Sequence, residues 1–322
     1  MSALVFAEHC ESDAAATERE MTERSERSHD PVMVREILEI LPLRPGSVAV
    51  DGTLGLAGHS VEIAKRISPG GTLIGFDWDS SMLEIARGNL DRSGASCHLE
   101  LINDSFFTIV SHLEGRKADG ILLDLGLNSA QVDDPERGIS FKADGPLDMR
   151  MDRSRGEPAA ALLNRWTEKQ IEDVLFKFGD ERWARAIAKK ILERRKVSPL
   201  RTTNDLVDCV LAAIPVGARD KRIHPATRSF QAIRIVTNGE LAELGEALQD
   251  SASCLAPGGV LAVLSYHSGE DRIVKQTFRE LAGGNFEELL KKPKVPSQEE
   301  ITRNPRSRSA KLRAIRKVEA TS

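Results

Sequence analysis

The sequence predicts an α/β protein built on a doubly wound, mostly parallel sheet that carries an inserted all-helical unit. Two observations carry this prediction. Between residues 31 and 124, short apolar runs alternate with amphipathic helical patterns, which is typical of strand–helix–strand units. Between residues 133 and 228 the alternation stops, only charged amphipathic helical patterns remain, and strand patterns then resume.

The bulk composition is that of an ordinary globular protein, but its charge is unevenly placed. The chain has 322 residues, a net charge of −4, and hydrophobic and charged fractions of 40% and 29%. Residues 1–30 carry eight acidic and three basic side chains, which leaves +1 for the remainder. We predict that residues 1–28 form a disordered acidic tail. The remainder is not a uniformly basic nucleic-acid binder, although local patches can still hold phosphate.

Cysteine usage and hydropathy favour the cytoplasm. The four cysteines are scattered, with no Cys-x-x-Cys pair, so neither a disulfide framework nor a zinc site is indicated. No apolar run approaches a membrane span, and the acidic N-terminus is unlike a secretory or organelle-targeting segment. We therefore expect a cytoplasmic protein without membrane association.

The first half of the chain supplies the expected strands and helices of the sheet. An amphipathic helix is expected after Pro31, and a Pro-Gly pair ends it. A glycine-rich turn then opens a second helix, and a serine cap opens a third near residue 80. The expected strands lie at residues 47–51, 72–79, 97–104 and 118–124.

The second half resembles an insertion rather than an appended domain. A loop over residues 136–158 leads into four amphipathic helices, and a helix, a Pro-Gly-Gly turn and an apolar strand follow at residues 240–265. The expected units are a sheet domain over 29–136 and 229–322, the latter with a basic C-terminal segment, and an inserted helical substrate-recognition unit over 137–228.

The glycine-rich turn after the first strand is a candidate nucleotide site. Gly52, Gly55 and Gly58 are spaced three and three, unlike the G-x-G-x-x-G of dinucleotide enzymes. On spacing alone, a ligand loop and a plain strand-to-helix turn fit equally well. Asp51 is expected to accept hydrogen bonds from loop amides or a ligand ammonium. His59 is expected to be a polar residue at the helix start rather than a general base.

Asp77 favours a ligand that contains a ribose. It ends the second strand 22 residues after Gly55, where a carboxylate can accept hydrogen bonds from ribose hydroxyls. The alternative is that Asp77 or Asp79 caps the next helix, and one residue can serve each purpose. These features predict either NAD or S-adenosylmethionine. The Pro-Gly-Gly turn and the acid that ends the fourth strand, Asp124, favour S-adenosylmethionine.

Seven motifs follow one another between His29 and Val318: "HDPVMVREIL", "DGTLGLAGHS", "GILLDLGLNSAQVDDPERGISF", "DGPLDMRMD", "HPATRSFQAIRI", "SYHSGEDRIVK" and "NPRSRSAKLR". Together they resemble the ribosomal RNA small-subunit methyltransferase H family, also called MraW. The resemblance implies a Rossmann-like class I methyltransferase domain, an inserted helical domain, and N4-methylation of one cytidine in the decoding region of small-subunit ribosomal RNA. The implied partner is that RNA in an assembled or assembling subunit, and homodimer formation is left open.

The resemblance also assigns residues to the S-adenosylmethionine site. They are Ala57, Gly58 and His59 in the loop, Asp77 at the ribose, Phe106 near the adenine, and Asp124 and Gln131. This chain departs from the family pattern where Leu56-Ala57 replaces Arg-Gly, where Asn128 and Ala130 replace Ser and Pro, and where Gly269 replaces Leu. The last three changes lie on the expected substrate side.

Methylation of a cytosine amino group needs positioning and acceptors for its N–H groups, because its lone pair is delocalised into the ring. Asp124 and the carbonyls after it are the expected acceptors, with Asn128 as the alternative if Asp124 is committed to the cofactor. His267 is a second candidate for proton removal, and a structural hydrogen bond is the other reading of this residue. No metal is required, because a sulfonium is already a good leaving group.

RNA contacts are expected from arginines beside the active site and near the C-terminus, since guanidinium groups match phosphate geometry. They are Arg137, Arg150, Arg153, Arg228, Arg306 and Arg308. A further set of cations between residues 182 and 195 fits a solvated helix face as well as an RNA surface. Trp183 and Phe230 are expected in the core rather than as stacking platforms.

Two other function classes stay open at this point. The first is a ribosome-assembly protein that binds S-adenosylmethionine without turnover, which the changes at residues 128, 130 and 269 motivate. The second is a nicotinamide-dependent oxidoreductase, which the glycine spacing disfavours.

Overall fold

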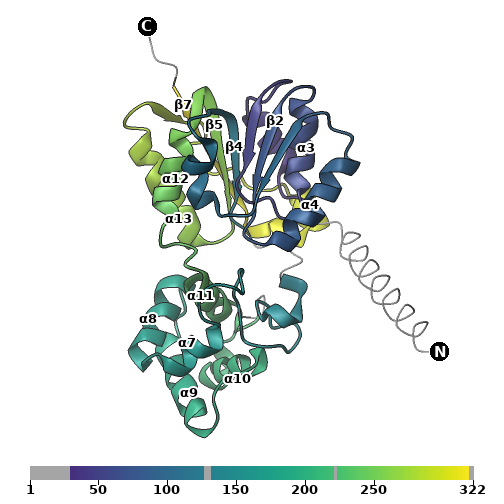
Figure 1. Cartoon of the computed structure of the whole chain (residues 1–322). Coiled ribbons are helices and arrows are strands. Elements are labelled where there is room, and N and C mark those ends of the chain that lie inside the picture. The colour runs from purple at the N-terminus through teal and green to yellow at the C-terminus, as the bar shows by residue number, and fades with distance from the viewer. Residues whose placement is uncertain (1–29, 127–131, 221–222, 319–322) are drawn as a thin grey trace, which may run out of the picture.

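The computed structural model describes residues 30–126, 132–220 and 223–318. Figure 1 shows two lobes, one built on a sheet and one made only of helices. The expected acidic tail over residues 1–28 lies outside the described residues, as do Asn128, Ala130 and Gln131.

The sheet has seven strands in the order β3-β2-β1-β4-β5-β7-β6. Strands β1 to β5 pair in parallel, whereas β7 runs antiparallel to both of its neighbours. Because the strand order reverses between β1 and β4, a crevice opens at their carboxyl ends. The strands are β1 (Val48–Asp51), β2 (Thr72–Phe76), β3 (His98–Ile102), β4 (Ala118–Asp124), β5 (Leu255–Ser265), β6 (Phe286–Glu288) and β7 (Lys311–Lys317).

Helices cover both faces of the sheet, so the doubly wound prediction is confirmed. Along β4, Leu122 packs into one buried cluster while Ile121 and Leu123 pack into the other, as strand alternation requires. One face carries α2 (Val34–Ile40), α3 (Gly58–Ile67) and α4 (Ser80–Arg92), and the other carries α5 (Ile109–Leu113), α12 (Leu244–Ser253) and α13 (Ser268–Leu281).

Two local expectations are wrong. The cap of α4 is Asp79 rather than a serine, and its carboxylate accepts the N–H of Ser81 at 3.1 Å. The Pro-Gly-Gly segment is not a turn ahead of the strand but part of β5. Its extra residues are absorbed by a register shift against β4 between Ala118 and Gly120, and Gly258 takes a φ of +78° there.

The inserted lobe packs five helices around its own apolar cluster. Phe230 is 3% exposed within it and Trp183 packs against it, as expected for core residues. The last helix, α11, runs across the expected boundary at residue 228 and packs against α8. These helices are α7 (Ala159–Arg165), α8 (Glu168–Gly179), α9 (Ala184–Val197), α10 (Thr203–Ala213) and α11 (Thr227–Asn238). Within the described parts of the chain, no helix is long and apolar enough to cross a membrane.

Candidate functional site

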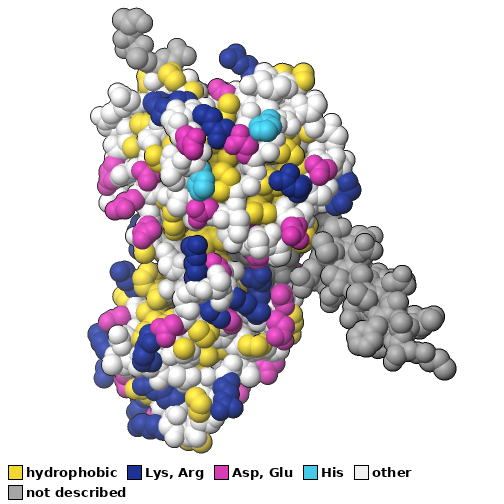
Figure 2. Space-filling model, viewed as in Figure 1, with side chains coloured by type: hydrophobic (Ala, Val, Ile, Leu, Met, Phe, Trp, Pro, Cys, Tyr) yellow, Lys and Arg dark blue, Asp and Glu magenta, His cyan; other side chains and the backbone are white. Residues whose placement is uncertain are grey.

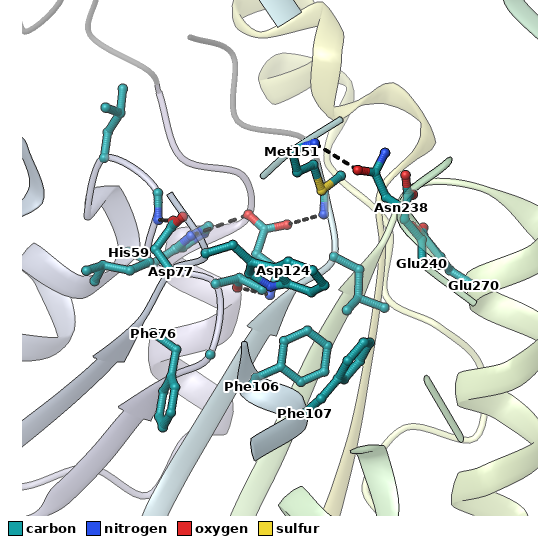
Figure 3. A pocket seen from close by; sticks show the side chains of 18 of the residues that line it. His59, Phe76, Asp77, Phe106, Phe107, Asp124, Met151, Asn238, Glu240 and Glu270 are labelled. Carbon is teal, nitrogen blue, oxygen red and sulfur yellow. Dashed lines mark hydrogen bonds and ion pairs between the residues drawn. The ribbon is translucent and has the colours of Figure 1, made fainter. Parts of the chain in front are cut away.

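A cavity lies at the carboxyl ends of β1, β2 and β4, where the strand order reverses (Figure 3). The loop after β1 forms its floor, Asp77 follows β2, and Asp124 ends β4. Met151 and Asn238 reach it from the helical lobe. The inserted lobe therefore closes one side of a site that the sheet builds.

The glycine loop is held in close contact with the sheet. A Cβ at Gly52 would lie 2.3 Å from the Leu123 side chain, so only glycine fits there. Ala57 ends the loop with a φ of +64°, a left-handed conformation that costs a residue with a Cβ about 1 kcal/mol. Gly58 starts α3, where a Cβ would meet Pro31 at 3.1 Å.

Asp51 fixes this loop from behind. Its carboxylate is 1% exposed and accepts hydrogen bonds from the Thr53 N–H at 3.1 Å and the Ser60 hydroxyl at 2.7 Å. Burial raises the pKa of Asp51, and the Ser60 hydrogen bond and the nearby His59 oppose that rise. The expected bond to a loop amide is confirmed.

Asp77 and Asp79 divide two roles between them. Asp77 lines the cavity, and its carboxylate accepts the N–H groups of Gly55 at 2.8 Å and Asp79 at 2.9 Å. Burial raises the pKa of Asp77 to about 6 even though both N–H groups oppose the rise. Asp79 caps α4 and pairs with Arg137. Burial works to raise the pKa of Asp79, but Ser81 and Arg137 together lower it.

Aromatic side chains form the apolar wall of the cavity. The Phe106 and Phe107 rings contact edge to face with centroids 4.7 Å apart, and Trp78 packs on Phe107 with centroids 5.9 Å apart. All three line the cavity beside Asp77. An aromatic wall next to a carboxylate suits an adenine ring joined to a ribose.

Asp124 is held through its backbone and has two polar neighbours. Its N–H donates to the Thr53 hydroxyl at 2.6 Å, its Oδ2 lies 3.6 Å from His59 Nδ1, and its carboxylate lies near the Tyr266 phenol. Burial and the neighbouring Asp124 carboxylate raise the pKa of Tyr266 well above its usual value, so the phenol stays protonated. His59 Nε2 in turn donates to the Val32 carbonyl at 2.8 Å.

A second cavity adjoins the first and shares the wall Asp124, Leu125 and Gly126 with it. Phe141 and Phe230 from the helical lobe line it, together with Tyr266 and His267 after β5. His267 is the N-cap of α13, and its Nδ1 accepts the N–H of Glu270 at 3.3 Å, so a structural hydrogen bond is confirmed for this residue.

The structure brings most of the expected cofactor residues together. Gly58, His59, Asp77, Phe106 and Asp124 line the first cavity. Ala57 is fully buried and contributes the turn itself. The expectations for Gln131 and Asn128 lie outside the described residues.

The arginines expected to bind RNA are largely engaged in ion pairs or hydrogen bonds. Arg137 and Arg150 pair with Asp79 and Asp148, and both are mostly buried. Arg153 lies 3.9 Å from Asp148, Arg228 donates to the Asp180 carbonyl, Arg306 pairs with Asp133, and Arg308 is exposed. In Figure 2, lysine and arginine side chains are spread over the helical lobe and near the junction of the lobes.

Sequence reasoning missed Tyr266, Thr53 and the pair of Arg234 with Glu240. Arg234 Nε and Nη2 bond the two oxygens of Glu240 at 2.8 and 2.9 Å. Tyr266 lies next to His267 within a quoted motif, so its place after a strand was the available signal.

The sequence of this chain was compared with models of known protein families. The model of the MraW methylase family matches residues 26–318. The chain belongs to the MraW methylase family. Two curated relatives are the ribosomal RNA small subunit methyltransferase H proteins of Trichlorobacter lovleyi and Koribacter versatilis. The first is 45% identical over 309 residues, covering 90% of this chain and 98% of the relative. The second is 45% identical over 294 residues, covering 89% and 93%.

Among solved structures, a putative rRNA-methylase from Clostridium thermocellum matches with a TM-score of 0.45 and 11% identity, covering 90% of this chain and all of that one. As an MraW methylase, the chain has a Rossmann-like methyltransferase domain, and its cofactor is S-adenosylmethionine. The recognition, fold and cofactor predictions are confirmed, and the nicotinamide-dependent alternative is excluded.

Proposed function

We propose that this MraW methylase methylates N4 of a specific cytidine in the decoding region of small-subunit ribosomal RNA. The observation that carries the proposal is the position of Asp124, whose carboxylate stands at the wall shared by the two cavities. A methyl transfer to an exocyclic amine needs an acceptor for its N–H groups where donor and base meet. The names of the curated relatives support ribosomal RNA of the small subunit as the substrate.

The residues of the first cavity suit S-adenosylmethionine. Asp77 would accept from the ribose hydroxyls, Phe106 would pack on the adenine, and the Gly58 backbone can approach closely because no Cβ intervenes. S-adenosylmethionine supplies a methyl group on a sulfonium, which makes that carbon electrophilic. The protein's part is to hold the acceptor amine in line with it.

Asp124 has two effects on the amine. It accepts an N–H and so fixes the direction of the nitrogen lone pair, and its negative charge stabilises the positive charge that develops on the nitrogen. Thr53 holds the backbone of Asp124 and Tyr266 lies near its carboxylate, so little reorganisation is needed during the reaction. Asn128 remains the alternative acceptor.

The RNA would lie across both lobes near their junction. We propose that the exposed Arg308 contacts phosphates, and that Arg153, Arg228 and Arg306 exchange their carboxylate or carbonyl partners for phosphates. The proposal also names the partner and the compartment. The partner is ribosomal RNA in an assembled or assembling small subunit, and the compartment is the cytoplasm. A homodimer is also compatible with it.

Transfer of a labelled methyl group to small subunits from cells that lack this enzyme tests the proposal. The expected product is N4-methylcytidine at one position after nucleoside analysis. S-adenosylhomocysteine binding without transfer would instead favour the assembly role. Label on another base would contradict the proposal directly.

A further inference from the structure

Arg137 joins the two lobes beside the first cavity. Its Nη2 donates to the Asp79 carboxylate, and its Nη1 donates to the Met151 carbonyl at 2.9 Å. Its Nε lies 3.9 Å from the Asp134 carboxylate, and the side chain is 16% exposed. All three guanidinium nitrogens thus face acceptors of the protein itself, so a phosphate would have to displace them in order to bind there.

The backbone around Arg137 belongs to the helical lobe. The Met149 N–H donates to the Arg137 carbonyl at 2.9 Å, and Met149 and Leu147 are buried in the apolar cluster of that lobe. The Leu147 N–H also donates to the Arg201 carbonyl at 2.9 Å, just ahead of α10. The guanidinium of Arg137 therefore reaches from the helical lobe to the sheet lobe, where Asp79 caps α4.

The partners of this guanidinium are bonded in turn to the walls of the first cavity. On the sheet side, the Asp79 N–H donates to the Asp77 carboxylate at 2.9 Å. On the helical side, the Met151 N–H donates to Asn238 Oδ1 at 2.8 Å (Figure 3). Asp77, Met151 and Asn238 all line the cavity. One ion pair thus connects cavity walls that come from different lobes.

We propose that Arg137 is a positioning residue for S-adenosylmethionine, whose ion pair with Asp79 holds the two lobes together beside the first cavity and keeps the Asp79 N–H on Asp77. The inference rests on the proposed function only in placing the cofactor ribose at Asp77. A ligand that contacts both walls favours the paired lobes, so cofactor binding and lobe pairing stabilise each other. On this account, Arg137 acts within the protein rather than on RNA.

The same pair influences the charge of Asp77. Burial is the main cause of the raised pKa of Asp77, and the neighbouring charges of Asp79 and Asp51 raise it further. The guanidinium of Arg137 offsets the negative charge of Asp79. Loss of the guanidinium alone should therefore raise the pKa of Asp77, whereas loss of the Asp79 charge should lower it.

Two variants and a control separate this positioning role from helix capping. Arg137→Gln removes the cation. Asp79→Asn keeps a cap on α4, because asparagine is a good N-cap, but it removes the negative charge. Arg155→Gln is the matched control, because Arg155 lies farther along the same segment and is an exposed side chain that pairs with Asp152 at 3.3 Å.

We expect Arg137→Gln and Asp79→Asn each to raise the Kd of S-adenosylhomocysteine about tenfold at pH 8, since each breaks a charge-assisted hydrogen bond. The double variant should also lose about tenfold rather than about a hundredfold, because both changes break the same bond. Arg155→Gln should match the wild type. Isothermal titration calorimetry measures these values.

Titrations between pH 5 and 8 supply a readout that a purely structural role would not move. The loss of affinity on acidification should begin at higher pH in Arg137→Gln than in the wild type, and at lower pH in Asp79→Asn. The slope of log K against log salt for small-subunit RNA should be unchanged in Arg137→Gln, because no phosphate contact is lost.

Four results would overturn the inference. One is an unchanged Kd for S-adenosylhomocysteine in Arg137→Gln, even where its melting temperature falls. Another is a pH dependence that moves in the same direction in both variants, and a third is losses that multiply in the double variant. The fourth is a lower salt slope of RNA binding in Arg137→Gln, which would make Arg137 a phosphate contact.

Failure of the proposed function gives different results. Asp77→Asn with the affinity of the wild type would remove the ribose from Asp77 and leave the ion pair of Arg137 in place. A different methylated base would leave the calorimetry untouched, because those titrations contain no RNA.

Discussion

Burial disfavours the negative charge of Asp77, whereas the hydroxyls of a bound ribose would favour it. Burial raises its pKa to about 6, while two backbone N–H groups favour the ionised form. Ribose hydroxyls would donate to the ionised carboxylate, so ligand binding must expel any proton held there. Because the folded pKa is raised, protonation favours the folded state as pH falls through about 6. Protonation of Asp77 therefore does not destabilise the folded state at acid pH.

We therefore expect the affinity for S-adenosylhomocysteine to fall below pH 6, by up to about tenfold per pH unit, and to be flat above pH 7. Isothermal titration calorimetry between pH 5 and 8 measures this. Asp77→Asn should bind more weakly at every pH, without the slope. A constant affinity of the wild type across that pH range would show that Asp77 does not bind the ribose.

Asp124 should matter to turnover more than to binding. We expect Asp124→Asn to lower kcat by about 10²–10³-fold, since the amide keeps an acceptor but loses the charge that stabilises the forming cation. Single-turnover methyl transfer at saturating donor gives the rate. The Kd for S-adenosylhomocysteine should change less than tenfold. An unaffected rate would assign the acceptor role elsewhere, with Asn128 the next residue to vary.

The location of a site residue could be predicted from the sequence where its position at the end of a strand determines that location. Asp77 and Asp124 follow or end two parallel strands, β2 and β4, on either side of β1, so their meeting at one sheet edge follows from topology. The contact of Tyr266 with Asp124 joins residues far apart in the chain, and nothing local indicates it. The bond between Arg234 and Glu240 depends on how α11 ends, which the sequence does not specify.

At the level of elements, β7 is held by ion pairs to α13 as well as by its backbone pairing in the sheet. Asp271 on α13 receives Arg313 at 2.7 Å and Lys311 at 3.0 Å, and Arg313 is 5% exposed. Burial works to raise the pKa of Asp271, but the two cations lower it overall. Its stabilising contribution is thus present at neutral pH and lost as pH falls below the usual carboxyl range.

We expect Asp271→Ala to destabilise the fold by about 3 kcal/mol, because it strands a buried guanidinium. Urea denaturation measures the change. Arg316→Ala in the same strand is the matched control, since Arg316 and its partner Glu287 are exposed and should contribute less than about 1 kcal/mol. Equal losses in the two variants would contradict the buried-pair account.

The N-terminal segment over residues 31–33 is anchored on both cavities. Pro31 lines the first and Val32 the second, and the Met33 N–H donates to the buried Glu300 at 2.7 Å. Glu300 belongs to α14 (Gln298–Arg303), which follows the sheet's last parallel strand by more than thirty residues. A distant C-terminal helix thus holds an N-terminal segment against the site.

Glu300→Ala should lower the melting temperature and weaken S-adenosylhomocysteine binding together, because the released segment leaves Met33 N–H unsatisfied and uncovers the cavity. Differential scanning fluorimetry with and without ligand reports both. Glu299→Ala, one residue earlier and exposed, is the control and should change neither. A ligand affinity that survives Glu300→Ala would limit the anchor to a structural role.

The sequence predicted the strands well in the parallel part of the sheet and less well at its antiparallel edge. Uninterrupted apolar runs identified β1, β2 and β4. The lysines and arginines of "KLRAIRK" predict a basic C-terminal segment, yet the run forms β7, and Arg313 is buried against an acid and does not face solvent. A charge pattern cannot show which cations are already neutralised.

For the whole molecule, the pairing of the arginines sets how RNA binding responds to salt. Arg308 is exposed, whereas Arg165 is bound through two nitrogens by Glu157. We expect Arg308→Ala to lower the slope of log K against log salt by about 1, and Arg165→Ala to leave it unchanged. Filter binding of small-subunit RNA over a salt series measures both slopes. Equal slopes for wild type and Arg308→Ala would exclude a phosphate contact there.

The two-lobe organisation was visible in the loss of strand patterns after residue 133, since only amphipathic helices follow. Its C-terminal boundary was less visible, because α11 continues the same helical pattern beyond residue 228. The identity of the methylated base comes from the family resemblance, as no single motif encodes it.

The wall shared by the two cavities has a practical consequence. Leu125 and Gly126 line both cavities, so the two spaces adjoin. Under the proposed function, with the cofactor in the first cavity and the target base in the second, we expect a synthetic molecule that tethers adenosine to cytosine through a short linker to fill both spaces, so that its second half binds at high effective concentration. Such a bisubstrate inhibitor would spare enzymes that bind adenosine alone.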